Sequence, residues 1–147
     1  MGLQPIPAIT RLENSEKLLS QYLRERIAAP FVWGQNDCIL FAADAVMAMT
    51  GTDLAADYRG TYSDEAGAAA LLESLGGIES LITNSLGIEP HQNWRRAFRG
   101  DVVLIDGGNG RLAAAIVADK GEFLAAARPM NNERRISRRL ALKVWNI

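Results

Sequence analysis

Apolar positions recur with a helical period in the first half of the chain and with a strand-like pattern in the last third. The first helical stretch places apolar residues every three or four positions from Leu18 to Ile27, after a capping Asn14 or Ser15. Pro30 ends this helix, because the residue before a proline is pushed out of the helical conformation. The pattern therefore predicts an amphipathic helix between positions 15 and 28.

A second helix is predicted from Cys38 to about Thr50, capped by Asn36 or Asp37 and stopped by Gly51. It is apolar on most faces, which is typical of a helix in the middle of a fold. Its single charged residue, Asp44, would need a partner or a solvated edge.

Two more helices are predicted downstream. An alanine-rich stretch begins at 63–65 and is broken by Gly76-Gly77, and a shorter one runs from Ile78 to Leu86 and is closed by Gly87. Two prolines within residues 2–11 indicate an extended arm instead.

Strand patterns replace helical ones after Gly100. Strands are predicted at 101–105, 112–118, 122–126 and 140–145, with a Gly-rich turn at 106–110 and a basic, turn-like segment at 128–139. Helices first and a small antiparallel sheet second is an α+β pattern. We expect an extended N-terminal arm at 1–12 and a single domain at 13–147.

Composition narrows the range of functions. The chain has 147 residues and a net charge of −1, so no global charge favours nucleic acid or an anionic membrane as partner. One cysteine and one histidine exclude an intrachain disulfide and a multi-cysteine or multi-histidine metal site, and no cofactor is expected. We see no signal peptide and no apolar run long enough for a membrane span, and we expect the chain to be made in a cytoplasm.

The candidate chemistry centres on Cys38. A thiol at a helix N-terminus is favoured as a thiolate by the free N–H groups and the helix dipole, whereas the adjacent Asp37 acts in the opposite direction. A cysteine peptidase also needs a histidine base and an orienting group.

The run 30–34 (Pro-Phe-Val-Trp-Gly), followed by Asp37-Cys38, resembles the nucleophile motif of NlpC-type cysteine peptidases. Arg99-Gly100-Asp101 and the strand after it resemble the Gly-Asp strand that precedes the catalytic histidine in that family. The resemblance implies a papain-like NlpC-type fold, with the cysteine at a helix N-terminus packed on the sheet. It also implies that Trp33 and Asp37 line the substrate site.

Several positions depart from that family. The histidine would fall at Leu112, and the third polar residue near Leu124 or Ala125. The motif tyrosine is Phe31, and the serine that usually follows the cysteine is Ile39. With base and orienting group absent together, the resemblance implies a scaffold that has lost its reaction.

The same motifs, with the closing Val144-Trp145, are similar to a family of small uncharacterised proteins from tailed bacteriophages. This resemblance implies a structural, catalytically silent component of the virion, at the tail tip or baseplate. Its partners would be other tail proteins such as the hub, and peptidoglycan remains a further candidate.

The alternative is an active cysteine peptidase or amidase that acts on peptidoglycan peptides during phage entry. It would use Cys38 as nucleophile and His91, the only histidine, as base. Each residue also has a structural interpretation: Cys38 as a small buried hydrophobe, His91 as a loop residue, Asp37 as a helix cap and Trp33 as a core anchor.

Two further features carry weaker expectations. Asp101 is predicted to cap the start of the sheet or to pair there with Arg99 or Arg59. The arginine pairs at 95–96, 134–135 and 138–139 are interpreted as solvated faces, or as surfaces that meet acidic patches of a partner.

Overall fold

A computed structural model describes residues 9–26, 28–108, 110–127 and 136–147. All four predicted helices are present: α1 (Ser15–Arg26), α2 (Cys38–Thr50), α3 (Glu65–Ser74) and α4 (Ile78–Leu86). Asp37, the second of the two expected candidates, caps α2, and Gly51 ends that helix in the left-handed conformation at φ 78°. Local capping chemistry therefore accounts for the position of the cysteine at the first residue of α2.

The last third of the chain forms an antiparallel sheet with the order β4-β3-β2-β1-β5. Its strands are β1 (Val102–Asp106), β2 (Leu112–Ala118), β3 (Phe123–Ala125), β4 (Ile136–Ser137) and β5 (Lys143–Trp145). The described residues also form three short 3-10 turns: η1 (Trp94–Arg96) precedes β1, η2 (Asp119–Gly121) connects β2 to β3, and η3 (Arg138–Leu140) connects β4 to β5. The α+β class predicted from the sequence is confirmed.

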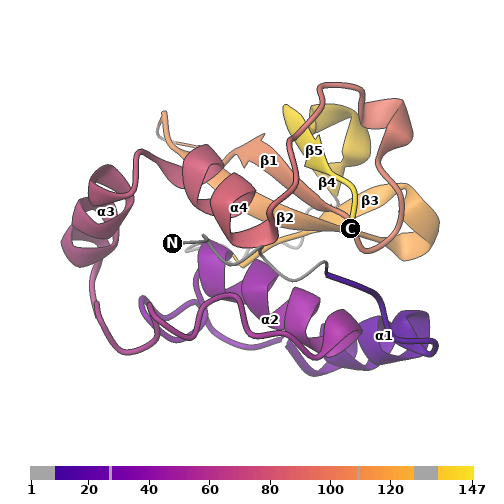
Figure 1. Cartoon of the computed structure of the whole chain (residues 1–147), viewed down its shortest axis with the longest axis horizontal. Coiled ribbons are helices and arrows are strands. Elements are labelled where there is room, and N and C mark those ends of the chain that lie inside the picture. The colour runs from indigo at the N-terminus through magenta and orange to yellow at the C-terminus, as the bar shows by residue number, and fades with distance from the viewer. Residues whose placement is uncertain (1–8, 27, 109, 128–135) are drawn as a thin grey trace, which may run out of the picture.

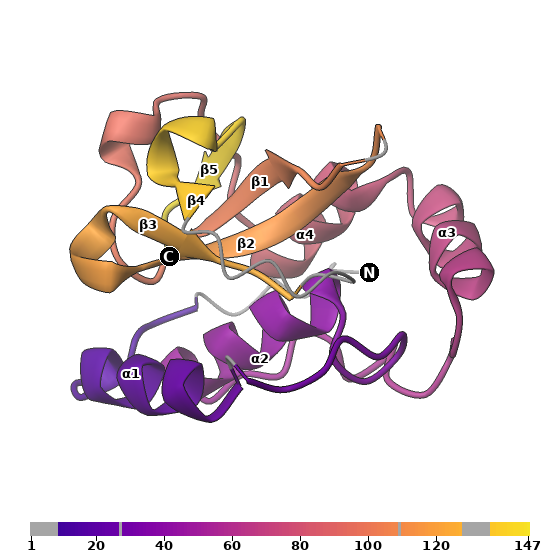
Figure 2. The same cartoon turned by 180° about the vertical axis from the view of Figure 1, so that it is seen from behind.

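The sheet buries both faces because β1 from Val102 to Ile105 and all of β2 are apolar, with alternate residues on opposite sides. Helices α1, α2 and α4 cover one face, while η1 and η3 lie beyond the other (Figures 1 and 2). Strand residues Val102, Leu104, Ala114 and Ile116 belong to the helix-side core, and Val103, Ile105, Ala115 and Val117 to the other. Helix α3 projects to one side, and Ala68 is its single buried residue.

Three local expectations need correction. The turn-like stretch expected through 139 contains strand β4 at 136–137, and the strand expected from 140 begins only at Lys143, because η3 occupies 138–140. The described part of the expected N-terminal arm, residues 9–12, packs on the domain: Ile9 contacts the helix-side core, and the Leu12 N–H donates to the Met49 carbonyl at 2.8 Å. Residues 1–8 of that arm, and most of the basic segment, lie outside the described residues.

In the described ranges, none of the helices has the length and apolar character needed to cross a membrane.

Candidate functional site

The turn before Cys38 is held by the carboxylate of Asp37, which is 1% exposed. Its Oδ1 accepts the N–H of Leu40 at 2.9 Å, which caps α2. Its Oδ2 accepts the N–H of Gly34 at 3.0 Å and the hydroxyl of Tyr62 at 2.5 Å. Both oxygens are therefore used within the protein, and the expected role of Asp37 as a substrate ligand is not supported by its geometry.

Gly34 fits this turn for two reasons. Its φ of +81° lies in the left-handed region, and a Cβ there would sit 2.2 Å from the backbone carbonyl oxygen of Tyr62. The segment around Tyr62 is thus packed directly against the cysteine turn. Burial and the contact with Asp37 raise the pKa of the Tyr62 hydroxyl, so it remains a proton donor to the carboxylate.

The Cys38 thiol lies at the start of α2, where it is partly buried and packs against the helix-side core. Burial raises the pKa of this thiol above its usual range, and the Asp37 carboxylate raises it further. Backbone N–H groups of Ala114, Ile39 and Cys38 itself lower it without reversing the direction. The environment therefore favours the neutral thiol, whereas a nucleophile requires the thiolate.

The backbone that faces the thiol across the interface is that of Ala114 on β2. Leu112, the position expected for a family histidine, lies two residues earlier, pairs with Asp106 and is 46% exposed. Because side chains alternate along a strand, Leu112 and Ala114 share a face of the sheet. Leu112, where the resemblance places the base, and Ala114, which faces the thiol, are therefore both apolar.

His91 is held at the β5 edge of the sheet. Its backbone pairs with Val144 of β5, with N···O distances of 2.9 and 2.8 Å. Its Nε2 lies 2.6 Å from Asn146 Oδ1 and donates to it, and its Nδ1 accepts the N–H of Asn93 at 3.2 Å.

Strands β5 and β1 lie between the His91 segment and β2, which is the strand that faces Cys38. Three strand spacings amount to about 14 Å, far beyond hydrogen-bond reach. The structure does not bring His91 to Cys38, so the expected dyad is not formed.

Trp33 contacts Phe31 edge to face, with ring centroids 4.8 Å apart and planes at 86°. Both rings are partly buried, and neither belongs to the two cores that sandwich the sheet. The interpretation of Trp33 as a core anchor is therefore wrong, since the ring pair lies partly buried in the segment that leads to Cys38, outside both cores.

An apolar cavity of about 50 Å³ lies between α2, α4 and the sheet, next to the first turn of α2. Ile39, Ala42 and Ala114 line it together with Leu81 and Leu86, whereas Cys38 is not among its lining residues. A peptide-binding pocket normally measures several hundred Å³ (roughly 300 or more) and presents polar groups. The small size and apolar lining of this cavity indicate a gap in side-chain packing. They do not indicate a substrate site beside the thiol.

The second motif aspartate, Asp101, is also 1% exposed but gathers distant parts of the chain. Oδ1 accepts from the Arg11 guanidinium and from the Ile147 N–H, both at 3.1 Å. Oδ2 accepts from the Phe98 N–H at 2.8 Å and from the Asn146 amide at 2.6 Å. The expected pairing with Arg99 or Arg59 is wrong: Arg99 donates to Ser20 and Arg59 to Asp53 and Asp44.

Asp44 of α2 has the partner that its burial requires. Arg26 of α1 contacts it at 2.8 Å, and Arg59 contacts both Asp44 and Asp53. Arg59 lowers the pKa of the Asp53 carboxyl, mainly through their hydrogen bonds. This ion-pair network joins α1, α2 and the 52–62 connection, and it is structural.

Sequence reasoning missed three participants: Arg11, Asn146 and Tyr62. Each bonds a motif aspartate from 25 to 90 residues away, a separation at which local pattern carries no signal. Nowhere in the described part of the chain do three His, Cys, Asp or Glu side chains gather in a way that could hold a metal ion.

Comparison with known proteins adds one relationship. No curated protein and no solved structure matches the chain. A family model described as a domain of unknown function, DUF6950, matches residues 10–147, which is nearly the whole sequence and includes both motif aspartates. The chain therefore belongs to the DUF6950 family.

Proposed function

We propose that this protein is a structural, catalytically silent component of a bacteriophage tail tip or baseplate, built on a degenerate NlpC-like peptidase scaffold. The observation that carries the silent part of the proposal is the surroundings of Cys38. Its thiol faces the backbone of Ala114, and the charged group that acts on its pKa is the anion of Asp37. Burial of the thiol and the Asp37 anion raise its pKa more than the Ala114 backbone N–H lowers it, so this environment disfavours the thiolate on which cysteine catalysis depends.

Asp37 and Asp101 support this proposal because both have structural roles in the fold. Asp37 shapes the cysteine turn and caps α2, and Asp101 joins the start of the sheet to residues near both ends of the described chain. These two residues give the sequence its peptidase-like motifs, and each is fully engaged inside the protein. A scaffold can keep such residues for folding after its reaction is lost.

The virion part of the proposal rests on resemblance of the motifs to tailed-phage proteins. It is tested in lysates of the phage or prophage that carries the gene, by gradient sedimentation and by immunogold labelling of intact tails. We expect the protein to sediment with tails and the gold to lie at their distal end. Protein found only at the top of the gradient, as free monomer, would contradict the assignment.

The catalytic part is tested separately, with purified protein and fluorescently labelled peptidoglycan. We expect no release of soluble fragments beyond that from the Cys38→Ala variant, which serves as the matched control. Release that depends on Cys38 would instead establish the peptidase alternative, with a base other than His91.

A further inference from the structure

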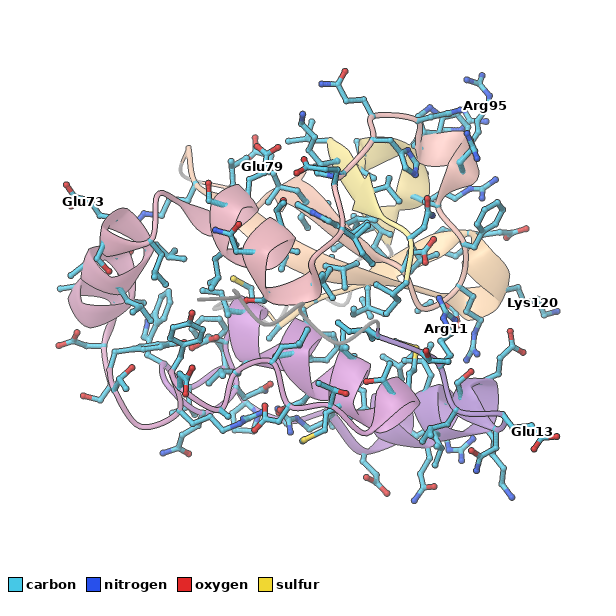
Figure 3. All side chains as sticks on the ribbon, viewed as in Figure 1. Arg11, Glu13, Glu73, Glu79, Arg95 and Lys120 are labelled. Atoms are coloured by element: carbon cyan, nitrogen blue, oxygen red, sulfur yellow. The ribbon has the colours of Figure 1, made fainter. Side chains whose placement is uncertain are left out.

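Three arginines converge on one tryptophan at the surface, on the side of the sheet away from the cysteine. The guanidinium carbons of Arg95, Arg138 and Arg139 lie 4.5, 5.4 and 5.3 Å from the ring centroid of Trp94. These four residues, which we call the arginine–tryptophan patch, come from η1 and η3, two 3-10 turns that pack together. Figure 3 shows Arg95 pointing outward from η1, at the end of the molecule opposite Glu73.

The patch is held in shape by the fold beneath it. Trp94 packs against the second core, and the Asn93 side chain caps η1 by accepting the Arg95 N–H at 3.1 Å. The Ser137 hydroxyl accepts the Arg139 N–H at 3.3 Å, and Arg138 donates to the Ala97 carbonyl at 3.1 Å. The guanidinium groups are thus arranged before any partner arrives, which reduces the entropy lost on binding.

The charge of the patch is not neutralised within the described chain. Across residues 9–26, 28–108, 110–127 and 136–147, no carboxylate forms an ion pair with these three arginines. Attraction to the indole face offsets only part of the mutual repulsion, since each such contact contributes about 0.5–1 kcal/mol at an exposed site. An anionic partner would remove the remainder.

We propose that the arginine–tryptophan patch is a docking site for a carboxylate-rich segment of a partner protein. Guanidinium groups stacked on a ring direct their N–H edges outward, and apart from the Arg138 N–H that donates to Ala97, those edges match the two oxygens of a carboxylate. Tryptophan and arginine are also the residues most enriched at the energetic centres of protein interfaces.

Nucleic acid fits the patch less well for two reasons. Single strands bind by stacking bases on free aromatic faces, and here guanidinium groups approach the ring of Trp94. The net charge of −1 also gives no long-range attraction for a polyanion beyond this local site. The proposal does not rest on the virion assignment, since it concerns a surface remote from Cys38.

The test uses the full-length protein and a fluorescein-labelled hexaglutamate peptide, followed by fluorescence anisotropy at low ionic strength. We expect saturable binding that weakens as salt is added, and no binding of the matched hexaglutamine peptide. The double variant Arg95→Glu/Arg139→Glu should weaken hexaglutamate binding by about tenfold or more. The control Arg24→Glu, at an exposed arginine of α1, should leave the affinity within about twofold of wild type.

A second variant guards against loss of fold. Arg95→Gln/Arg139→Gln removes charge without reversing it, and it should also weaken binding while far-UV circular dichroism stays unchanged. Absence of saturable hexaglutamate binding, or equal affinity in Arg24→Glu and the double variants, would overturn the proposal. So would tighter binding of an oligothymidylate of equal charge, which would assign the patch to single-stranded nucleic acid.

Discussion

Asp37 and Asp101 are equally buried, belong to the two motifs that resemble a peptidase, and accept hydrogen bonds on both oxygens, yet they differ in what they hold. Asp37 accepts from neutral donors, two of them within three residues along the chain. Asp101 accepts from the nearby Phe98 N–H, but its other three donors, which include the Arg11 cation, lie 45 to 90 positions away. One aspartate fixes a local turn, and the other fixes tertiary structure.

The difference shows what each motif does in the fold. The Asp37 turn still presents Cys38 at a helix N-terminus, but nothing in its bonding depends on a substrate. Asp101, in the second motif, is bonded to other parts of the chain at the start of the sheet. Its partner Asn146 also accepts from His91, so the same network fixes the histidine. The histidine that could have supplied a base is thus part of the network that holds the fold.

The largest expected effect is at Asp101. In Asp101→Asn the new amide must face two donors whichever way it turns, and the Arg11 cation loses its anion. We expect the free energy of unfolding, measured by urea denaturation, to fall by about 3 kcal/mol. The exposed Asp57→Asn is the control and should change it by less than about 0.5 kcal/mol.

Asp37→Asn should cost less. Its amide can take the Oδ2 position and donate to the Tyr62 oxygen, so the Gly34 N–H and the Tyr62 O–H lose this acceptor, while the cap on Leu40 survives. We expect a loss of about 1–2 kcal/mol in the same denaturation experiment. Equal losses in Asp37→Asn and Asp101→Asn would remove the distinction between a local and a tertiary role.

Tyr62→Phe isolates the long-range part of the Asp37 site. It removes a single hydrogen bond and leaves the carboxylate with its two backbone donors. The expected loss is about 1 kcal/mol. Because Tyr62 is the distant donor to Asp37, a loss as large as that of Asp101→Asn would show that the cysteine turn also depends on tertiary contacts.

The smallest expected effect is the change with pH in Cys38 alkylation and in the contribution of Cys38 to stability. Its raised pKa means that alkylation by iodoacetamide should follow a midpoint above the free-cysteine value of about 8.5. Because the folded-state pKa is the higher one, this contribution to stability is complete below the unfolded pKa and disappears as pH rises through the folded pKa.

The matched control for this titration is Cys38→Ala. The difference in unfolding free energy between wild type and this variant should be constant near neutral pH and should shrink in alkali. Rapid alkylation of Cys38 well below pH 8 would contradict the environment described for the thiol.

Much of the fold follows from local sequence. Gly51, Gly76-Gly77 and Gly87 mark the ends of helices, and the apolar runs of β1 and β2 are long enough to be recognised. Strand β4 could not be predicted, because it is two residues long and follows a basic stretch without alternation. The last strand is predicted to begin at 140, inside η3, because the two arginines of that 3-10 turn give no clear periodic signal.

The candidate site was predictable only in its local part. The capping role of Asp37 follows from its position just before the apolar helix. The need of Asp44 for a partner follows because it is a lone charge among apolar residues. The environment of Cys38 required knowledge of which β2 residue faces α2, and register is set by tertiary packing. The arginine–tryptophan patch similarly brings together residues more than forty positions apart.

The hydrogen bond from Arg11 Nε to the Ile147 carbonyl, at 2.9 Å, has a mechanical consequence. A force that pulls residues 11 and 147 apart loads this bond and the Asp101 contacts before it reaches the sheet. Strand β5 would then peel from β1 one pair at a time, since only three residues join them. The Asp101 cluster is thus the part of the domain that such a stretching force would load first.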